Sequence, residues 1–427
     1  MKKRTLIQLA LTFLFFSLPF FFFRVVPNFL PLKIPMDVDK IRTGPHAGKY
    51  LVTDVSGKIV IMNFTTSEVV WETDEPHFFV HEAAMMPDGN SIIVADTEAN
   101  RVFVMNISNK VILWEWYAKN NTHYTYMDYM NWTEFGLTHG WNEEALAIVQ
   151  DFNPPRDLGS LVVHYTHLNK VQFINGSDFN RTYDTILISV RNFDIIIEVN
   201  YTAQEGEAAY MNITWHYGMP GDHATLNHQH MPTRWNQTGH VGHTTICDSD
   251  NNRIIEIDAN NTVVWEYTGN KLRWPRDCDL LPNGNYLITD SGNNRIIEVN
   301  RTTNSIVRTF TDPWFFIPYE ADYIEEDNQI VVGVNQIIMI FDYETGKVVK
   351  TIGFAYMVAP FLIIIGIAII YVSIDSILQF RKMQEKSVIT RLKSYEMYSK
   401  FILIGILVMI MYFLNYIANF FGYYMLR

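Results

Sequence analysis

The sequence predicts an all-β fold, a six-bladed β-propeller, carried by one N-terminal and two C-terminal transmembrane helices. Three observations support this prediction. Six segments in the middle of the chain share one pattern, equivalent residues in neighbouring segments lie at a repeated spacing, and long apolar runs flank the repeats. A chain of 427 residues suits one large repeat domain with additional segments.

Each of the six repeats has an apolar strand rich in β-branched residues, a polar turn, and a second strand of alternating character. They are 48–63, 89–106, 184–200, 243–258, 284–300 and 328–342. Equivalent turn residues lie 42 positions apart, from Asp54 to Asp96 and from Asp248 to Asp290. This is the length of one four-stranded propeller blade. A β-sandwich, the alternative for repeated hairpins, does not predict six copies at one spacing.

Several repeats continue into a further strand, as at 69–72, 111–115 and 263–266. The longer gap between the second and third repeats holds an aromatic-rich insertion, about 116–161. Two interpretations of this insertion stay open. It forms a lid that stacks on an aromatic ligand, or it packs over the rim of the propeller.

Three apolar runs lie outside the propeller, which we place at residues 27–353. The runs at 5–26, 354–378 and 401–426 are each long enough to cross a bilayer. Lys and Arg concentrate before the first run and in the loop 379–400, so both are expected in the cytoplasm and the propeller outside it. The first run is an anchor or a signal peptide, and no small-residue cleavage site follows it. We therefore expect a multi-pass protein of the cell membrane.

Asn-x-Ser/Thr sequons recur through the middle section and are missing from the loop 379–400, which agrees with a glycosylated, extracellular propeller. They begin at Asn63, Asn106, Asn120, Asn131, Asn175, Asn180, Asn200, Asn212, Asn236, Asn260 and Asn300. The net charge of −12 and the lack of a basic tract exclude an ordinary nucleic-acid binder. Cys247 and Cys278 exclude a disulfide-rich scaffold, but outside the cell they would be able to pair with each other.

Propeller geometry gathers the loops that lead into the innermost strands at one mouth of a central channel. These loops supply several residues with catalytic or ligand-binding potential: His81, His167, His230, Arg276 and Glu320. An Asp-x-x-x-Asn-Arg turn also recurs between strands, and we interpret its arginines, Arg101, Arg253 and Arg295, as structural. The remaining histidines, His240 and His243 among them, are expected mainly at the surface or in loops.

Two kinds of ligand are compatible with this mouth. Three histidines with Glu82 or Glu320 would suit zinc. Arg191 and Arg276 argue against a cation, because a guanidinium keeps its charge and matches the geometry of sulfate or phosphate. We therefore favour an anion site. A histidine facing a bound sulfate or phosphate ester would act as general base or as nucleophile.

The residues that line the predicted mouth resemble the arylsulfotransferase family, propeller enzymes that move a sulfuryl group between aryl esters and phenols without a nucleotide donor. The resemblance lies in HEAAMMPDGN, in HLNKV followed by DTILISVRNFD, and in QHMP followed by ICDSDNNRIIEID. The stretches WPRDCDLLPNGNYLITDS and PYEAD are similar to an archaeal branch of the family. About residues 45–350 are covered. Glu82 stands where the family usually has Asp, and extra residues separate His167 from Arg191.

The resemblance implies a nucleotide-independent sulfotransferase that uses neither metal nor cofactor. It implies that His230 is transiently sulfated and that His81, His167 and Arg191 hold the sulfuryl oxygens. Arg276 matches only the archaeal branch, and we expect it to contact the substrate together with Glu320. The partners would be a small aryl sulfate donor and a phenolic acceptor. Two alternatives stay open: a non-catalytic surface propeller that binds an anionic ligand or a protein, and a metal-dependent hydrolase.

Overall fold

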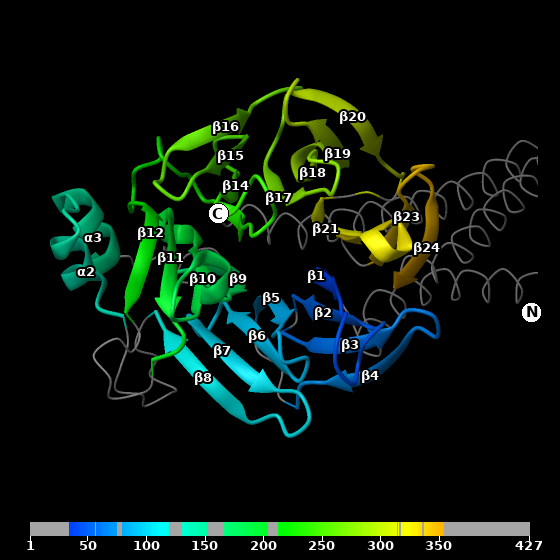
Figure 1. Cartoon of the computed structure of the whole chain (residues 1–427), viewed down its shortest axis with the longest axis horizontal. Helices are drawn as coiled ribbons and strands as arrows, with labels where there is room; N and C mark the ends of the chain where they lie inside the picture. Colours follow the sequence, from blue (N-terminus) through cyan, green and yellow to red (C-terminus); the bar gives the residue numbers. More distant parts are fainter. Residues whose placement is uncertain are drawn as a thin grey trace, which may run out of the picture. The chain divides into compact units, whose positions relative to one another are not determined.

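The computed structural model describes residues 34–353 apart from 56, 75–78, 119–129, 152–164, 204–211, 314, 316 and 335–336. The described residues form six four-stranded antiparallel sheets around a common centre (Figure 1). The predicted six-bladed, all-β propeller is thereby confirmed. The predicted transmembrane segments 5–26, 354–378 and 401–426 lie outside the described residues. Within the described part of the chain, no helix is both long and apolar enough to cross a membrane.

Each blade is built from four consecutive strands. Blade 1 contains β1 (Pro35–Lys40), β2 (Tyr50–Asp54), β3 (Ile59–Asn63) and β4 (Glu68–Glu72). Blade 2 contains β5 (Val80–Met85), β6 (Ser91–Asp96), β7 (Arg101–Asn106) and β8 (Ile112–Tyr117). Blade 3 contains β9 (Leu168–Ile174), β10 (Thr185–Val190), β11 (Ile195–Asn200) and β12 (Ile213–Gly218).

The other three blades repeat this plan. Blade 4 contains β13 (His230–Arg234), β14 (Thr244–Asp248), β15 (Arg253–Ile257) and β16 (Val263–Tyr267). Blade 5 contains β17 (Pro275–Leu280), β18 (Tyr286–Asp290), β19 (Arg295–Asn300) and β20 (Ser305–Phe310). Blade 6 contains β21 (Pro318–Ile324), β22 (Gln329–Val334), β23 (Ile337–Asp342) and β24 (Val348–Gly353).

The first strand of each blade lies next to the first strands of its neighbours, and β21 lies against β1, which closes the ring. The six segments recognised in the sequence correspond to the second and third strands of the six blades. These strands are buried on both faces, as in β6 and β18, because neighbouring blades pack on each side. The fourth strands form the outer edge and are more exposed; in β4 exposed and half-buried side chains alternate.

The repeated Asp-x-x-x-Asn-Arg turns tie the second strand of a blade to the third. The Nε atoms of Arg101, Arg253 and Arg295 donate to the carboxylates of Asp96, Asp248 and Asp290 at 2.9, 2.6 and 2.6 Å. The Asn residues of these turns adopt left-handed backbone angles, with φ between 52° and 55°. Asn tolerates this conformation better than most residues. The geometry agrees with a structural role for the three arginines.

The described part of the insertion forms two short helices, α2 (Trp132–Thr138) and α3 (Glu143–Asp151), which lie beside β12 at the edge of blade 3 (Figure 1). Trp132 donates its indole N–H to the carbonyl of Ala118 at 2.8 Å, and its ring lies 5.3 Å from that of Phe193. Phe193 follows Arg191 in the turn after β10. This part of the insertion therefore packs on the rim and supports the turn that carries Arg191.

Cys247 and Cys278 are both free and fully buried in the apolar core shared by blades 4 and 5. The possible disulfide between them is thus not formed in this structure. Burial raises the pKa of both thiols well above the usual range, which keeps them protonated and unreactive.

Several sequons have a structural role in turns. Asn63, Asn106 and Asn300 end β3, β7 and β19. Their side-chain oxygens accept the backbone N–H two residues later, at 2.9, 3.0 and 3.0 Å. Such Asx turns favour Asn, and a following Ser or Thr is common in turns. Asn200 is buried, at 8% exposure, whereas Asn260 is exposed. Glycosylation stays a prediction, and Asn200 is a poor acceptor for it.

Candidate functional site

Three of the predicted histidines come together where the innermost strands of blades 2, 3 and 4 begin. His81 is the second residue of β5, His167 directly precedes β9, and His230 begins β13. The ring centroid of His81 lies 5.3 Å from that of His167 and 6.3 Å from that of His230. His81 and His230 are buried, and His167 is partly exposed. We call these three residues the histidine cluster.

Local backbone irregularities place these side chains. The pairing of β5 with β6 skips His81, because Val80 pairs with Asp96 and Glu82 with Ala95. Arg276 occupies the same kind of bulge between β17 and β18. A bulge changes the direction of a side chain and is common near functional sites. His167 has a left-handed backbone, with φ of +48°, directly before its strand.

Arg191 occupies a position that carries a hydroxyl group in other blades. Thr97, Ser249 and Ser291 follow the second strands of their blades, and each donates to a carbonyl of the next innermost strand at 2.6 Å. In blade 3 the residue after β10 is Arg191, which is 6% exposed. Its Nη1 donates to Asn192 at 2.9 Å, while its Nε has no hydrogen-bond acceptor among the described residues. A buried guanidinium thus keeps an unmatched donor.

Arg276 lies over the aromatic rings of two neighbouring residues. Its guanidinium carbon is 4.7 Å from the ring centroid of Trp274 and 4.2 Å from that of Tyr319. The Trp274 ring lies 5.9 Å from that of His230, so Trp274 joins the arginine to the histidine cluster. Beside the other two histidines, the Phe79 ring lies 5.4 Å from that of His81 and 6.0 Å from that of His167. The cluster is therefore flanked by aromatic surfaces.

The two guanidinium groups influence each other electrostatically. Burial and, to a smaller extent, the positive charge of Arg276 lower the pKa of Arg191, while Asp250 and Asp194 oppose the shift, and the resulting pKa is about 10. Arg191 still carries its charge at neutral pH, at a cost in desolvation. A bound anion would relieve both the burial of this charge and the repulsion from Arg276.

The hydrogen bonds of His230 determine which ring nitrogen carries its proton. Its Nδ1 lies 2.8 Å from the hydroxyl oxygen of Ser249. That hydroxyl donates its single hydrogen to the carbonyl of Pro275 at 2.6 Å. Ser249 must therefore accept from His230, so Nδ1 carries the proton and the lone pair of the neutral ring lies on Nε2. This tautomer suits a nucleophile that reacts through Nε2.

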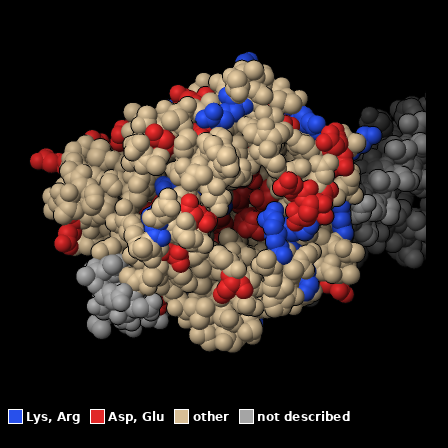
Figure 2. All heavy atoms as spheres, in the orientation of Figure 1, with Lys and Arg blue, Asp and Glu red and all other residues tan. Residues whose placement is uncertain are grey.

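Glu320 belongs to a different group of residues. Seven acidic side chains on innermost strands form a group that we call the carboxylate ring: Asp37, Asp39, Glu82, Asp277, Asp279, Glu320 and Asp322. Figure 2 shows Asp and Glu atoms lining the central hollow. Lys170 forms an ion pair with Glu82, and its Nζ lies 3.8 Å from Glu320. The structure therefore groups Glu320 with Lys170 and other carboxylates, not with the histidines.

Members of the carboxylate ring connect neighbouring blades. Asp37 accepts the backbone N–H of Ala83 at 3.4 Å, Glu82 that of Val171 at 2.9 Å, and Asp277 that of Ala321 at 3.1 Å. Each bond runs from one innermost strand to the next. The ring therefore has a structural role, which the sequence analysis missed.

Burial changes the protonation of the carboxylate ring. It raises the pKa of Glu82 to about 7 and that of Asp277 to about 6, although Lys170 and backbone N–H groups favour the charged forms. Burial also raises the pKa of Asp37, Asp279, Glu320 and Asp322 well above the usual range. The pKa of Lys170 is raised well above its ordinary value, because four carboxylates outweigh its own burial. Burial in the ring therefore favours the protonated forms of its carboxyl groups.

A repeated motif contains the signal for this ring. The sequence Pro-x-Asp/Glu-x-Asp occurs at 35–39, 275–279 and 318–322, on the innermost strands of blades 1, 5 and 6. The repeat that the sequence predicts for blade 1 begins at its second strand and therefore does not include Asp37 and Asp39. Aligning the three copies would have placed six acidic side chains around the channel.

Metal-binding potential lies elsewhere than in the histidine cluster. Two groups in the described part of the chain place three ligand atoms within 4.8 Å of one another: Asp37, Asp39 and Asp322, and His240, His243 and Glu256. The three histidines of the cluster do not form such a group among the described residues. The second group was not predicted from the sequence.

Comparisons with known proteins do not assign a family. No family model matches the chain, and no curated protein matches it. One solved structure with similarity, described as "Streptogramin B lyase structure", has a TM-score of 0.45 and 14% sequence identity. The match covers 76% of this chain and 84% of that chain. The function must therefore be inferred from the site itself.

Proposed function

We propose that this protein is a sulfotransferase that moves a sulfuryl group from an aryl sulfate ester to a phenol without a nucleotide. The observation that carries this proposal is the position of His230, held as its Nδ1–H tautomer, beside two more histidines and near two buried guanidinium groups. Such a combination supplies a nucleophile and donors for an anionic group. Phe79, Trp274 and Tyr319 supply apolar surface for aromatic rings.

In the first step, the lone pair on Nε2 of His230 attacks the sulfur of the bound ester. An N–S bond forms as the S–O bond to the aryl group breaks, and the electron pair leaves on the phenolate oxygen. Arg191, His81 and His167 hold the sulfuryl oxygens, and the unmatched Nε of Arg191 is available for one of them. Ser249 accepts the Nδ1 hydrogen of His230 and so stabilises the positive charge that develops on the ring.

In the second step, the acceptor phenol takes the place of the first one. Its oxygen attacks sulfur, the N–S bond breaks, and the electron pair returns to Nε2 of His230. The proton of the acceptor passes to a neighbouring imidazole or to solvent. No metal takes part in either step, and Arg276 with its aromatic neighbours orients the aryl group.

The proposal includes a membrane location. Helices at 5–26, 354–378 and 401–426 would anchor the protein with residues 379–400 in the cytoplasm and the propeller outside. The support is the length of the apolar runs and the distribution of Lys and Arg.

A second candidate is a propeller that binds an anionic ligand without reacting with it. The same buried guanidinium groups favour this function, because they would hold a sulfate or phosphate group equally well. The two candidates differ in one covalent intermediate that can be detected. Only a sulfotransferase forms a covalent sulfohistidine.

The deciding experiment measures release of a chromogenic phenol from its sulfate ester by the detergent-solubilised full chain, with an acceptor phenol and EDTA present. Wild type should turn over and should show sulfate on His230 by mass spectrometry after rapid quenching. His230→Ala should lose both signals. His139→Ala, at an exposed histidine that caps the C-terminus of α2, serves as the matched control. Undiminished turnover by His230→Ala would refute the mechanism, and ester binding without turnover would establish the binding propeller.

A further inference from the structure

A second cluster of metal-ligating side chains lies in blade 4, away from the histidine cluster. His240 and His243 belong to the loop between β13 and β14, and Glu256 is on β15. His230 begins β13, whereas this loop follows the end of β13 at Arg234. The two sites therefore lie at opposite ends of the same blade.

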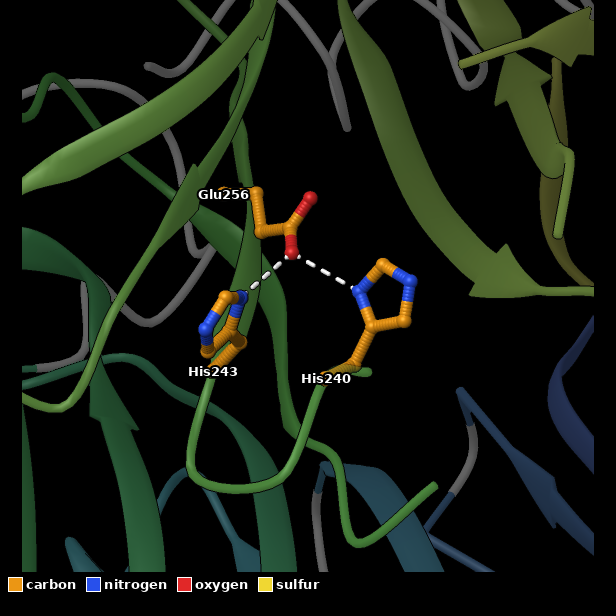
Figure 3. Close-up of side chains that lie close together, drawn as sticks. All are labelled: His240, His243 and Glu256. Carbon is orange, nitrogen blue, oxygen red and sulfur yellow. Dashed lines mark hydrogen bonds and ion pairs between the residues drawn. The ribbon is translucent and has the colours of Figure 1, made fainter. Parts of the chain in front are cut away.

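The two imidazoles converge on one carboxylate oxygen (Figure 3). Nδ1 of His240 lies 2.8 Å from Oε1 of Glu256, and Nδ1 of His243 lies 2.7 Å from the same oxygen. The three ligand atoms are all within 4.8 Å of one another. Glu256 is fully buried, while the side chains of His240 and His243 are 15% and 24% exposed. The cluster is therefore open to solvent on the histidine side.

The other oxygen of Glu256 is held in place from blade 5 and the turn that follows β19. Oε2 accepts the hydroxyl of Tyr286 and Nε of Arg301, both at 2.8 Å. The carboxylate is thus fixed in orientation, with Oε1 directed at the histidines. Such supporting hydrogen bonds are typical of metal-ligating carboxylates.

The loop that carries the histidines has a defined backbone. The N–H of His243 donates to the carbonyl of His240 at 2.9 Å, and the N–H of Trp235 donates to the carbonyl of His243 at 2.9 Å. Gly239 and Gly242 have φ of +87° and +80°, backbone angles that residues other than Gly rarely adopt. The loop therefore presents both rings on one side before any ligand binds.

We propose that His240, His243 and Glu256 bind a divalent transition metal ion of the zinc type. Two imidazole nitrogens and one carboxylate oxygen are a known ligand set for zinc, and solvent would complete the coordination. The ion would replace the hydrogen bonds to Oε1, with each ring moving its proton from Nδ1 to Nε2. Ligands of tetrahedral zinc lie roughly 3.3 Å apart, so each ring withdraws from Glu256 by about half an ångström. The bound ion would link the loop to β15.

The test uses the untagged full chain in detergent, stripped with a chelator, dialysed, and titrated with Zn²⁺ and with Co²⁺. Wild type should bind one equivalent of zinc, and its melting temperature should rise with the free zinc concentration, because the ion binds only the folded state. Cobalt should give the visible absorption of a site with low coordination number. These readouts do not depend on sulfotransferase activity.

The informative variant is His240→Asn/His243→Asn, because an amide still donates a hydrogen bond to Glu256 but is a poor zinc ligand. Without metal it should melt near the wild-type temperature, and it should lose the zinc equivalent and the zinc-dependent rise. His46→Asn/His139→Asn is the control for the removal of two histidines. It should keep the bound zinc equivalent and the zinc-dependent rise in melting temperature. Absence of zinc binding by wild type would overturn the proposal. If His240→Asn/His243→Asn still bound one equivalent of zinc, the proposal would also be overturned. The result would then point to Asp37, Asp39 and Asp322 as the ligands.

Discussion

The histidine cluster and the carboxylate ring both lie on innermost strands and share β5, yet they have opposite chemistry. In blade 2 His81 and Glu82 are adjacent, and in blade 5 Arg276 and Asp277 are adjacent. The bulged residue contributes nitrogen atoms to the mouth, and the next residue contributes a carboxylate to the ring. One step along the strand therefore separates a group suited to anions from a group that would repel them.

The two regions differ in whether their polar and charged groups have partners within the protein. Asp37, Glu82 and Asp277 accept backbone N–H groups from the next blade, and Lys170 pairs with Glu82 and lies near Glu320, so these hydrogen bonds lie within the protein. Arg191 keeps an unmatched Nε, and its charge is opposed by burial and by Arg276. A region with internal partners stabilises the fold. A region with a buried charged group that is only partly hydrogen-bonded is the better candidate for ligand binding.

The largest effect is expected for Lys170→Met. Removing one partner of a buried ion pair typically costs about 3–5 kcal/mol, because the remaining charge is left without compensation. The free energy of unfolding, measured with urea at pH 8, should fall by this amount. The loss should be smaller at pH 5, where Glu82 and Glu320 take up protons instead.

The surface pair of Lys58 and Glu72 provides the control for this substitution. Its N···O distance is 3.5 Å, and both side chains are exposed. Lys58→Met should change the unfolding free energy by less than about 1 kcal/mol. If Lys170→Met behaves like Lys58→Met, the carboxylate ring is not held together by its counter-ion.

The second effect separates Arg191 from Glu320. If Arg191 contacts the sulfuryl oxygens, Arg191→Gln should lower kcat/KM for an aryl sulfate roughly 100- to 1000-fold, as loss of an oxyanion-stabilising donor does. Glu320→Gln should change it by less than about tenfold, since Glu320 is grouped with the carboxylate ring. An equal loss in both variants would return Glu320 to the substrate site, as the sequence analysis expected.

The fold was predictable because its signal is local and repeated. Asp54, Asp96, Asp248 and Asp290 mark equivalent turns, and each repeat has the same pair of apolar strands. The innermost strands were expected as loops, because acidic or polar residues, as in β1, β17 and β21, interrupt the apolar pattern that identified the second and third strands. His81 and His230 were predictable because they lie close before repeats recognised in the sequence; in the structure they are the second residue of β5 and the first residue of β13.

The remaining parts of the two sites depend on contacts between blades. Asp37 belongs to the ring only because blade 6 closes against blade 1. His240 and His243 meet Glu256 through the return of β14 and β15, and no short spacing in the sequence indicates that contact. Asn106 belongs to a glycosylation sequon, and the sequon does not indicate its role in a turn. In the structure its side chain accepts the N–H of Ser108.

The smallest effect is a pH dependence that the carboxylate ring contributes to stability. Burial raises the pKa of Glu82 from 4.5 to about 7, so between these values the folded state binds more protons than the unfolded state. The stability that this group contributes is therefore complete below about pH 4.5 and is lost as the pH rises through 7, by an amount on the order of 3 kcal/mol. Asp277, with a pKa raised to about 6, acts in the same direction. Glu82→Gln keeps an acceptor for the Val171 N–H and should flatten the decline in unfolding free energy between pH 5 and 8, whereas Glu72→Gln at the surface should leave it as steep as in wild type. An unchanged slope in Glu82→Gln would mean that Glu82 is ionised throughout this range and that the ion pair with Lys170, not burial, determines its charge.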